Sequence, residues 1–253
     1  MRNLKATLRY DGTDFAGWQV QPGLPTVQGA LMDALQRITG EPTKVTGAGR
    51  TDAGVHALGQ VANFETPSNI ATRNLRRAIN SALVPRIRVD ELEDAPEEFD
   101  ARKHARDKLY RYTILLADFP DPLLFRYSWQ IRPKVDIELM KQAATLLVGK
   151  HDFSSFQGSA DTDRSPVRTV LSLDVHGAPG PFPNDARDGF LHVDIRADGF
   201  LNKMARNIVG TLVEVGRRKV APADLKKILA ARDRQLAGPA APARGLCLVS
   251  VRY

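Results

Sequence analysis

The sequence has one cysteine, Cys247, and no apolar run long enough to cross a bilayer. A lone cysteine excludes an internal disulfide framework, and a transmembrane helix needs about 20 apolar residues. The opening stretch MRNLKATLRYDGTDF has charges where a signal peptide needs an apolar segment. We therefore expect a soluble cytoplasmic protein with no membrane association. Its 253 residues, 43% of them hydrophobic, are enough to bury a core.

Several motifs of common enzyme classes are also missing. Gly49 and Gly54 have the spacing of a Walker phosphate loop, but Val55 and His56 stand where Lys and Ser/Thr belong. Asp52 occupies the position of the third glycine in a dinucleotide fingerprint. The five histidines are scattered, without a Cys, His or carboxylate partner at metal-ligand spacing. No G-x-S-x-G nucleophile elbow occurs. We expect no metal site.

Positive charge, by contrast, is in excess. The net charge is +7, and 25 of the 36 basic residues are arginine. Residues 1–104 contain equal numbers of basic and acidic side chains, so the whole excess lies in residues 105–253. Such a charge favours a polyanionic partner, most often nucleic acid, and arginine suits phosphate recognition. A genome that prefers arginine codons would explain the same composition.

Hydrophobic periodicity predicts one order of elements twice, β-α-β-β-α-β. In the first half the strands are expected at 4–10, 44–49, 58–65 and 86–93, and the helices at 26–40 (Thr26 as N-cap, Gly40 as end) and 71–83. In the second half the strands are expected at 108–116, 167–176, 190–198 and 246–253, the helices at 136–149, 200–216 and 221–232, and a hairpin loop at 176–189.

This repeated order is typical of ferredoxin-like folds, which combine an antiparallel sheet with covering helices. We therefore predict an α+β protein of two halves, residues 1–104 and 105–253. Their mainly antiparallel sheets are expected to meet near residues 95–108 at a central cleft. The second half would be the basic one and would complete that cleft.

The stretch GAGRTDAGVH (47–56) joins the second and third predicted strands. A nearby guanidinium such as that of Arg50 favours the ionised form of a carboxylate such as that of Asp52. An ionised aspartate can serve as a nucleophile or a general base. The alternative is structural: Asp52 caps the turn, with Arg50 bonded to it or free in water. The residues alone leave both interpretations open.

GRTDAGVHA (49–57) resembles the active-site motif of the TruA family of tRNA pseudouridine synthases. The resemblance extends over nearly the whole chain, in the family's order. The other blocks that carry it are YDGTDFAGWQVQPGLPTVQGAL (10–31), KLYRYTI (108–114), HDFSSF (151–156), VRTV (167–170), FLNKMARNIVGTLVEVG (200–216) and AGPAAPARGLCL (237–248).

The resemblance implies a pseudouridine synthase fold and a cofactor-free isomerase that converts uridine to pseudouridine at positions 38, 39 and 40 of the tRNA anticodon stem-loop. Asp52 falls on the catalytic aspartate. Attack on the uracil ring, attack on ribose C1′ and proton abstraction to a glycal remain open routes. The resemblance also implies a homodimer that binds one tRNA with both subunits.

The resemblance places four further residues in the site. Tyr110 matches the tyrosine that stacks on the target base, and Arg206 the arginine that pairs with the catalytic aspartate. Arg50 matches an arginine that acts in base flipping, and Leu246 an apolar position of the uracil pocket. Departures beside the site are Asn202, Lys203 and Ala205, and the segment GRRKV (216–220).

Basic residues of several helices are candidates for contact with the tRNA backbone. These are Arg73, Arg76, Arg77, Arg217, Arg218, Lys219, Lys226 and Lys227. Two other functions lack the sequence features that they require. A non-catalytic RNA-binding protein of two RRM-like halves would need paired aromatics in an RNP1-like strand, which we do not find. A metal-free hydrolase would need a second catalytic carboxylate, which no motif places.

Overall fold

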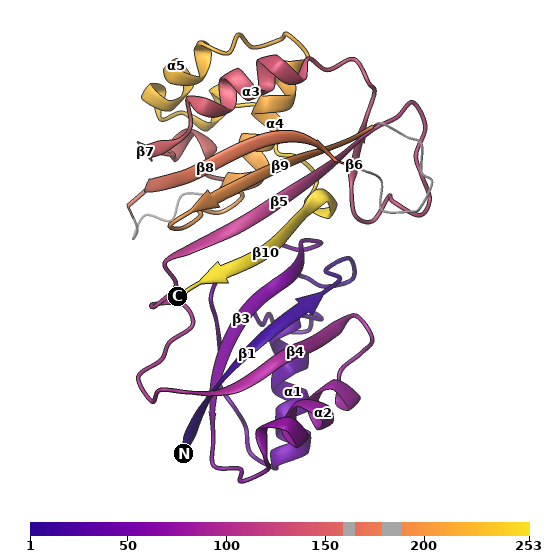
Figure 1. Ribbon diagram of the computed structural model, residues 1–253, viewed down its shortest axis with the longest axis vertical. Helices are drawn as coiled ribbons and strands as arrows, with labels where there is room; N and C mark the ends of the chain where they lie inside the picture. Colours follow the sequence, from indigo (N-terminus) through magenta and orange to yellow (C-terminus); the bar gives the residue numbers. More distant parts are fainter. Residues whose placement is uncertain (159–164, 179–188) are drawn as a thin grey trace. The chain divides into compact units, whose positions relative to one another are not determined.

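The computed structural model describes residues 1–158, 165–178 and 189–253. The chain divides into two compact units. Met1–Arg106 and Cys247–Tyr253 form the first unit, and Asp107–Leu246 form the second. Each unit combines a mainly antiparallel sheet with helices, as expected (Figure 1). No helix in the described part of the chain is long and apolar enough to cross a membrane.

The sheet of the first unit is built on three long antiparallel strands. β1 (Arg2–Tyr10) lies between β4 (Ile87–Ala95) and β3 (His56–Thr66), and the short β2 (Val45–Gly47) pairs with the far end of β3. Two helices connect these strands, α1 (Val27–Thr39) and α2 (Thr72–Ala82). The predicted β-α-β-β-α-β order of residues 1–104 is confirmed.

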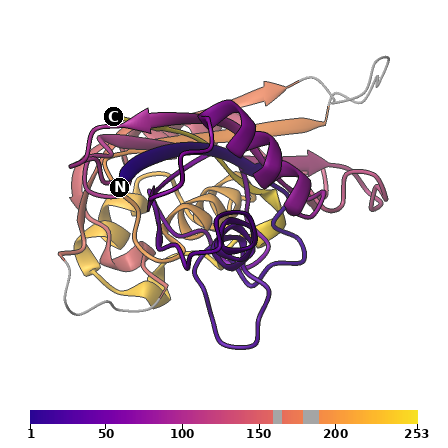
Figure 2. The ribbon, with the colours of Figure 1, turned by 90° about the horizontal axis from the view of Figure 1, so that it is seen from below.

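Helix α1 forms for the reasons that its sequence suggests. The Thr26 hydroxyl accepts a hydrogen bond from the Gly29 N–H at 3.2 Å, and Gly40 ends the helix in the left-handed region with φ +77°. Val27 and Leu31 are buried on the face turned to the core. Figure 2 shows α1 nearly end-on. The chain continues from this helix into β2.

The last strand joins the first unit. β10 (Leu246–Arg252) pairs in parallel with β3, with Cys247 opposite His56 and Leu248 opposite Ala57. The Tyr253 ring packs on Phe99 with ring centroids 5.0 Å apart, and its hydroxyl donates to the Ala101 carbonyl at 2.8 Å. Our assignment of this strand to the range 105–253 therefore differs from the structure, because β10 packs into the core of the first unit.

The sheet of the second unit has the antiparallel order β5-β9-β8-β7. Its strands are β5 (Asp107–Leu116), β9 (Phe190–Ala197), β8 (Val167–Ala178) and β7 (Gly149–Asp152). A short β6 (Trp129–Ile131) runs parallel to β5. We did not predict β6 and β7, which are too short to show a periodic pattern. Most of the predicted hairpin loop at 176–189 lies outside the described residues.

The described part of the second unit contains three α-helices, of which α3 and α4 pack against each other. They are α3 (Ile137–Thr145), α4 (Met204–Gly216) and α5 (Asp224–Ala231). Single 3-10 turns lie at η1 (Ser154–Phe156), η2 (Arg234–Leu236) and η3 (Ala243–Gly245). Helix α4 begins four residues later than predicted, because Lys203 precedes it in the left-handed region with φ +57°.

Candidate active site

The loop of residues 47–56 lies in the first unit, between β2 and β3. It contains a tight turn in which the Val55 N–H donates to the Asp52 carbonyl at 3.1 Å. Gly54 has φ +77°, the value that the third position of a type II turn requires. Gly47 has a different reason: a Cβ there would lie 2.5 Å from the Trp18 indole. Gly54 is therefore explained by a turn and Gly47 by close packing.

The loop between β1 and α1 holds this turn from outside. The backbone N–H of Trp18 donates to the Thr51 carbonyl at 3.0 Å, and the backbone N–H of Gly54 donates to the Phe15 carbonyl at 3.4 Å. Gly17, with φ +102°, makes a close approach: a Cβ there would lie 2.6 Å from the Thr51 carbonyl oxygen. The backbone on both sides of Asp52 is therefore fixed by a neighbouring segment.

Buried polar side chains hold the same loop from inside. The Tyr10 hydroxyl and the Thr51 hydroxyl are 2.9 Å apart, and the fully buried Gln60 amide donates to the Gly49 carbonyl at 2.9 Å. Burial raises the pKa of Tyr10 to about 12, so this hydroxyl stays protonated at neutral pH. Asp52 itself is half-buried. A carboxylate on such a braced loop is pre-positioned for chemistry.

Arg50 is exposed, and its Nε donates to the Gln19 side-chain oxygen at 3.2 Å. His56, at the end of the loop, is buried, and its Nδ1 accepts a hydrogen bond from the Gly12 N–H at 3.1 Å. The guanidinium thus lies at the surface, while the imidazole ties the start of β3 to the segment after β1.

Tyr110 lies in β5, in the second unit. It is buried and meets the Phe200 ring edge-on, with centroids 4.7 Å apart. Tyr112 and Ile114 are buried on the same face, and Arg111 points to the other face, where it forms a two-pronged ion pair with Asp194 at 2.7 Å. The expected alternation of this strand is confirmed.

Arg206 lies in the first turn of α4 and is bound to the segment that precedes η3. Its Nε donates to the Ala241 carbonyl at 2.7 Å, and its own carbonyl accepts from the Ala241 N–H at 3.0 Å. Gly210 allows this approach, because a Cβ there would clash with the Pro239 carbonyl oxygen. The Arg206 side chain is half-buried and therefore held in place.

Leu246 is only 6% exposed and follows η3 directly. Gly245, just before it, lies against the Tyr112 ring, and the Tyr112 hydroxyl donates to the Pro242 carbonyl at 2.7 Å. Burial raises the pKa of Tyr112, although the positive charges of Arg206 and Arg244 oppose that rise. One packed region of the second unit thus contains the candidate residues Arg206 and Leu246.

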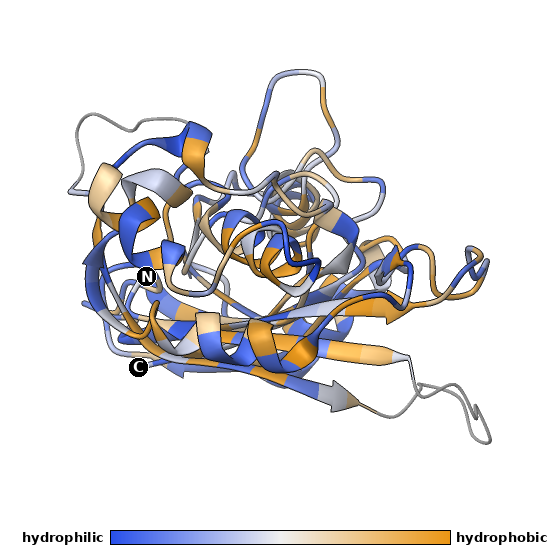
Figure 3. Cartoon of the chain, turned by 90° about the horizontal axis from the view of Figure 1, so that it is seen from above, coloured by the Kyte–Doolittle hydropathy of each residue, from blue (hydrophilic) through white to orange (hydrophobic). Residues whose placement is uncertain are grey.

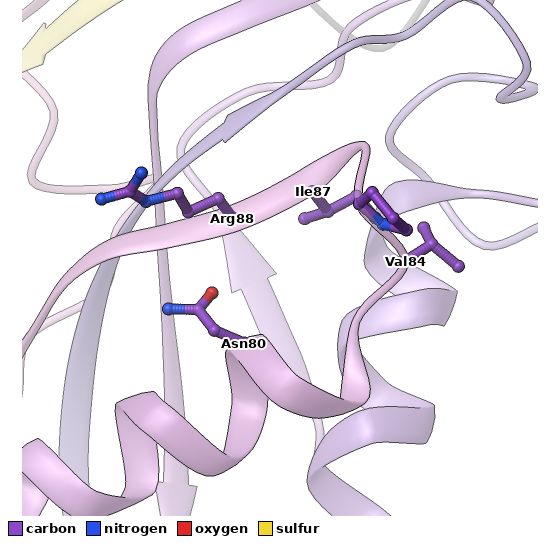
Figure 4. Close-up of a pocket in the computed structure, with 5 residues that line it drawn as sticks. Asn80, Val84, Ile87 and Arg88 are labelled. Atoms are coloured by element: carbon purple, nitrogen blue, oxygen red, sulfur yellow. The ribbon is translucent and has the colours of Figure 1, made fainter.

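A hollow of about 330 Å³ lies elsewhere, at the end of α2 (Figure 4). Its lining includes Asn80, Val84, Ile87 and Arg88 and none of the candidate site residues. Asn80 serves the fold, because its side chain bonds both the N–H and the carbonyl of Val89. Among the residues that the structure describes, no group of three His, Cys, Asp or Glu could hold a metal ion.

Comparison with known proteins decides the family. The family model described as tRNA pseudouridine synthase matches residues 6–102 and 143–253. This chain belongs to the tRNA pseudouridine synthase family. It is therefore an isomerase, and the resemblance of its motifs to that family is confirmed.

Individual relatives agree with the family match. A tRNA pseudouridine synthase A from Moorella thermoacetica is 47% identical over 252 residues, which cover 99% of both chains. Proteins of the same name from Brevibacillus brevis and Geobacter sp. (strain M21) are 45% and 42% identical, and each comparison covers 100% of this chain and at least 99% of the relative. A crystal structure of a Cbf5-Nop10-Gar1 complex aligns with 97% of this chain and 48% of its own, at 16% identity and a TM-score of 0.34.

The stretches that match the pseudouridine synthase family contain Arg50, Asp52, Arg206 and Leu246. Tyr110 lies between them, in residues 103–142, and rests on the motif KLYRYTI alone. Sequence reasoning missed the residues that brace the loop, chiefly Tyr10, Trp18 and Gln60. Tyr10 and Trp18 occur in a block that resembles the family, but nothing local to Gln60 distinguishes it from any other strand residue.

Proposed function

We propose that this pseudouridine synthase converts uridine to pseudouridine at positions 38, 39 and 40 of the tRNA anticodon stem-loop, using an aspartate and no cofactor. The observation that carries the proposal is Asp52, half-buried on a loop that hydrogen bonds fix from both sides. Its position within GRTDAGVHA, inside the stretch that matches the family, supports the same role.

The chemistry requires a fixed carboxylate. The uracil must be detached from C1′ of the ribose, turned, and rejoined through C5, so the C5 hydrogen is lost. A carboxylate can attack as a nucleophile or remove a proton, and either role depends on its placement within a fraction of an ångström. The hydrogen bonds of Tyr10 to Thr51 and of Gln60 to Gly49, just before Asp52, support such a placement.

The other candidate residues are assigned roles toward the same nucleotide. The target base must leave its stack, which costs a few kcal/mol. We propose that Tyr110 stacks on the base, that Arg50 acts in flipping, and that Leu246 lines the uracil pocket. Arg206 acts as the active-site arginine of the family, and its half-buried guanidinium suits a fixed charge.

The basic helices are proposed to bind the tRNA backbone, and the structure ranks them. Arg73 and Arg77 are exposed on α2, whereas Arg76 donates to the Asp90 carbonyl. Near the end of α4, Arg217 pairs with Glu214 at 2.9 Å and Arg218 with Asp136 at 3.0 Å. Arg73, Arg77 and the exposed Lys226 of α5 are therefore the stronger candidates, because the described residues give them no such acidic partner.

We also propose that the enzyme works as a cytoplasmic homodimer that binds one tRNA with both subunits. Sedimentation at the assay concentration tests the dimer. A species of monomer mass that is fully active would overturn it.

The decisive experiment is tritium release from unmodified tRNA that carries [5-³H]uridine. Wild type should release tritium. Asp52→Asn should release at least about 10³-fold less, because a positioned acid–base or nucleophilic group supplies that much of the rate. The matched control is Asp33→Asn, which removes the same charge from an exposed position of α1. Both variants should bind tRNA as wild type does.

Two results would contradict the proposal. One is wild type that binds tRNA and releases no tritium. The other is Asp52→Asn with the activity of Asp33→Asn, which would return Asp52 to the role of a turn residue.

A further inference from the structure

The segment that joins β5 to β6, residues 117–128, exposes large apolar side chains close together. We call it the aromatic loop. Phe119 is 83% exposed, Leu123 68%, Phe125 52% and Tyr127 48%. Figure 1 shows the loop projecting past the ends of β5 and β6, and Figure 3 shows hydrophobic and hydrophilic positions interspersed along it. Large exposed apolar side chains concentrated in one short segment indicate a surface that binds something.

The shape of the aromatic loop is fixed by its own hydrogen bonds. The Asp121 carboxylate accepts from the Leu123 N–H at 2.8 Å, and the Asp121 carbonyl accepts from the Phe125 N–H at 2.9 Å. Leu124 is buried against Leu115 and Phe190. The fold thus anchors one side chain of the loop inward and holds its neighbours outward.

Positive charge lies on the C-terminal side of these exposed rings, whereas Asp118 and Asp121 flank Phe119 on the N-terminal side. Arg126, Arg132 and Lys134 are exposed, and the sequence has no acidic residue from 122 to 135. The Arg244 guanidinium lies 4.4 Å from the centre of the Phe125 ring, and its Nε donates to the Ser128 carbonyl at 3.1 Å. Aromatic faces among arginine and lysine are the composition of sites that stack unpaired bases and neutralise phosphates.

Arg244 also places the aromatic loop beside the proposed uracil pocket within the second unit. It belongs to η3 and precedes Leu246 by two residues. Phe125 is therefore joined, through one side chain, to the segment that carries Leu246. The loop lies within residues 103–142, outside the stretches that the family model matches.

We propose that the aromatic loop is a stacking platform for an unpaired base of the RNA that flanks the target uridine. Phe125 and Tyr127 contact the base, and Arg126, Arg132 and Lys134 contact neighbouring phosphates. This inference rests on the proposed function, since it takes the RNA to be the substrate.

A second copy of the chain fits the surface less well. A two-fold contact through this surface would bring two copies of the same basic patch together. A single-stranded polyanion is complementary to both the rings and the charge.

The test uses an anticodon hairpin RNA in which cytidine replaces the target uridines, so that binding is measured without turnover. Fluorescence anisotropy compares wild type with the double variant Phe125→Ala/Tyr127→Ala. Affinity for the hairpin should fall roughly 5- to 100-fold, the range for loss of one stacked base. A fully paired duplex of the same length should bind both proteins equally.

Two control proteins accompany the double variant. Leu236→Ala removes a side chain that is 55% exposed elsewhere in the second unit and should bind as wild type does. Phe125→Leu/Tyr127→Leu keeps apolar bulk without the aromatic faces, so it should lose affinity while retaining the fold. If the alanine variant does not fold, the leucine variant still tests whether the aromatic faces contribute to hairpin affinity.

Hairpin affinity equal to wild type in a folded leucine variant would overturn the platform. The platform would also be overturned by a leucine variant that sediments as a monomer and keeps the hairpin affinity of wild type. That result would assign the surface to contact with a second copy of the chain. Failure of the proposed function looks different: wild type then releases no tritium from tRNA, while the hairpin comparison still gives its own answer.

Discussion

In the first unit Asp52 lies on a loop, whereas in the second unit Tyr110 lies on a strand and Arg206 on a helix. The loop is fixed by hydrogen bonds from residues that are distant in sequence, such as Tyr10 and Trp18. The strand and the helix are fixed by their own ladders and by packing. Precision in the first unit therefore depends on contacts outside the motif. In the second unit regular structure carries the residues, and the hydrogen bonds to Ala241 add to it at Arg206.

After Asp52→Asn, the largest expected effect tests whether Arg206 is more than a packing residue. Arg206→Lys should lower kcat roughly 10²-fold, because lysine cannot reproduce a fixed guanidinium fork beside developing charge. The matched control is Arg234→Lys, since Arg234 also bonds the segment before η3, through the Ala237 carbonyl. Tritium release and thermal unfolding are measured for both. Equal losses of kcat would reduce Arg206 to a structural role.

Tyr110 tests whether a strand residue supplies a stacking face. Tyr110→Leu should lower kcat/KM about 10- to 100-fold, because a base stacked on an aromatic ring is worth roughly 1–3 kcal/mol. Tyr110→Phe keeps the ring and should stay within about threefold of wild type if stacking alone matters. The same tritium assay measures both. If Tyr110→Phe lowers kcat/KM as much as Tyr110→Leu does, the hydroxyl of Tyr110 is required rather than its aromatic face.

Gly17 and Gly23 form a matched pair for the bracing of the Asp52 loop. Both have positive φ, but a Cβ at Gly17 would lie 2.6 Å from the Thr51 carbonyl oxygen, while a Cβ at Gly23 meets nothing within 4 Å. Gly17→Ala should lower kcat about tenfold by displacing the backbone beside Asp52. Gly23→Ala should only lower the melting temperature slightly. Identical kinetics in the two variants would show that the outer brace is dispensable.

Salt dependence compares the basic side chains of the two units. Arg73→Gln/Arg77→Gln should reduce the slope of log affinity against log salt by roughly 2, about 1 for each lost phosphate contact. Arg217→Gln/Arg218→Gln should reduce it less, because Glu214 and Asp136 already pair with these side chains. tRNA binding is titrated from low to moderate salt. The reverse ranking would move the backbone contact to the second unit.

The smallest effect concerns His192, in the sheet of the second unit. Burial, with the Arg111 charge, lowers its pKa from 6.5 to about 4, against the opposing effect of Asp194. As the pH falls below 6.5, His192 becomes protonated in the unfolded chain, whereas in the folded chain it stays neutral until about pH 4. The free energy of unfolding therefore decreases between pH 6.5 and about pH 4.

Urea unfolding at pH 7 and pH 5 measures this effect. His192→Gln should lose less stability between the two pH values than wild type does. His104→Gln, at an exposed position of the first unit, should behave as wild type does. A pH dependence that survives His192→Gln unchanged would assign it to other groups of the second unit.

Most of the long elements were predictable from the sequence, because their patterns are local. Thr26 and Gly40 mark the two ends of α1, and alternation in 108–116 places Tyr110 on the buried face. The start of α4 was not predictable, because the left-handed conformation of Lys203 is imposed by tertiary context. Asp52 was recognisable from its motif. Its bracing by Tyr10 and Gln60 was not, since such contacts join residues 41 and 11 positions apart.

The pairing of β10 with β3 has a consequence for how the enzyme is made. Residues 1–106 leave the ribosome first, yet their sheet receives the strand beside His56 only after residues 107–246 have been synthesised. Contacts of such long sequence separation form late, since the intervening chain must first be ordered. The unit that bears the Asp52 loop is thus begun first and completed last, so a nascent chain acquires its full architecture only when translation has passed the second unit.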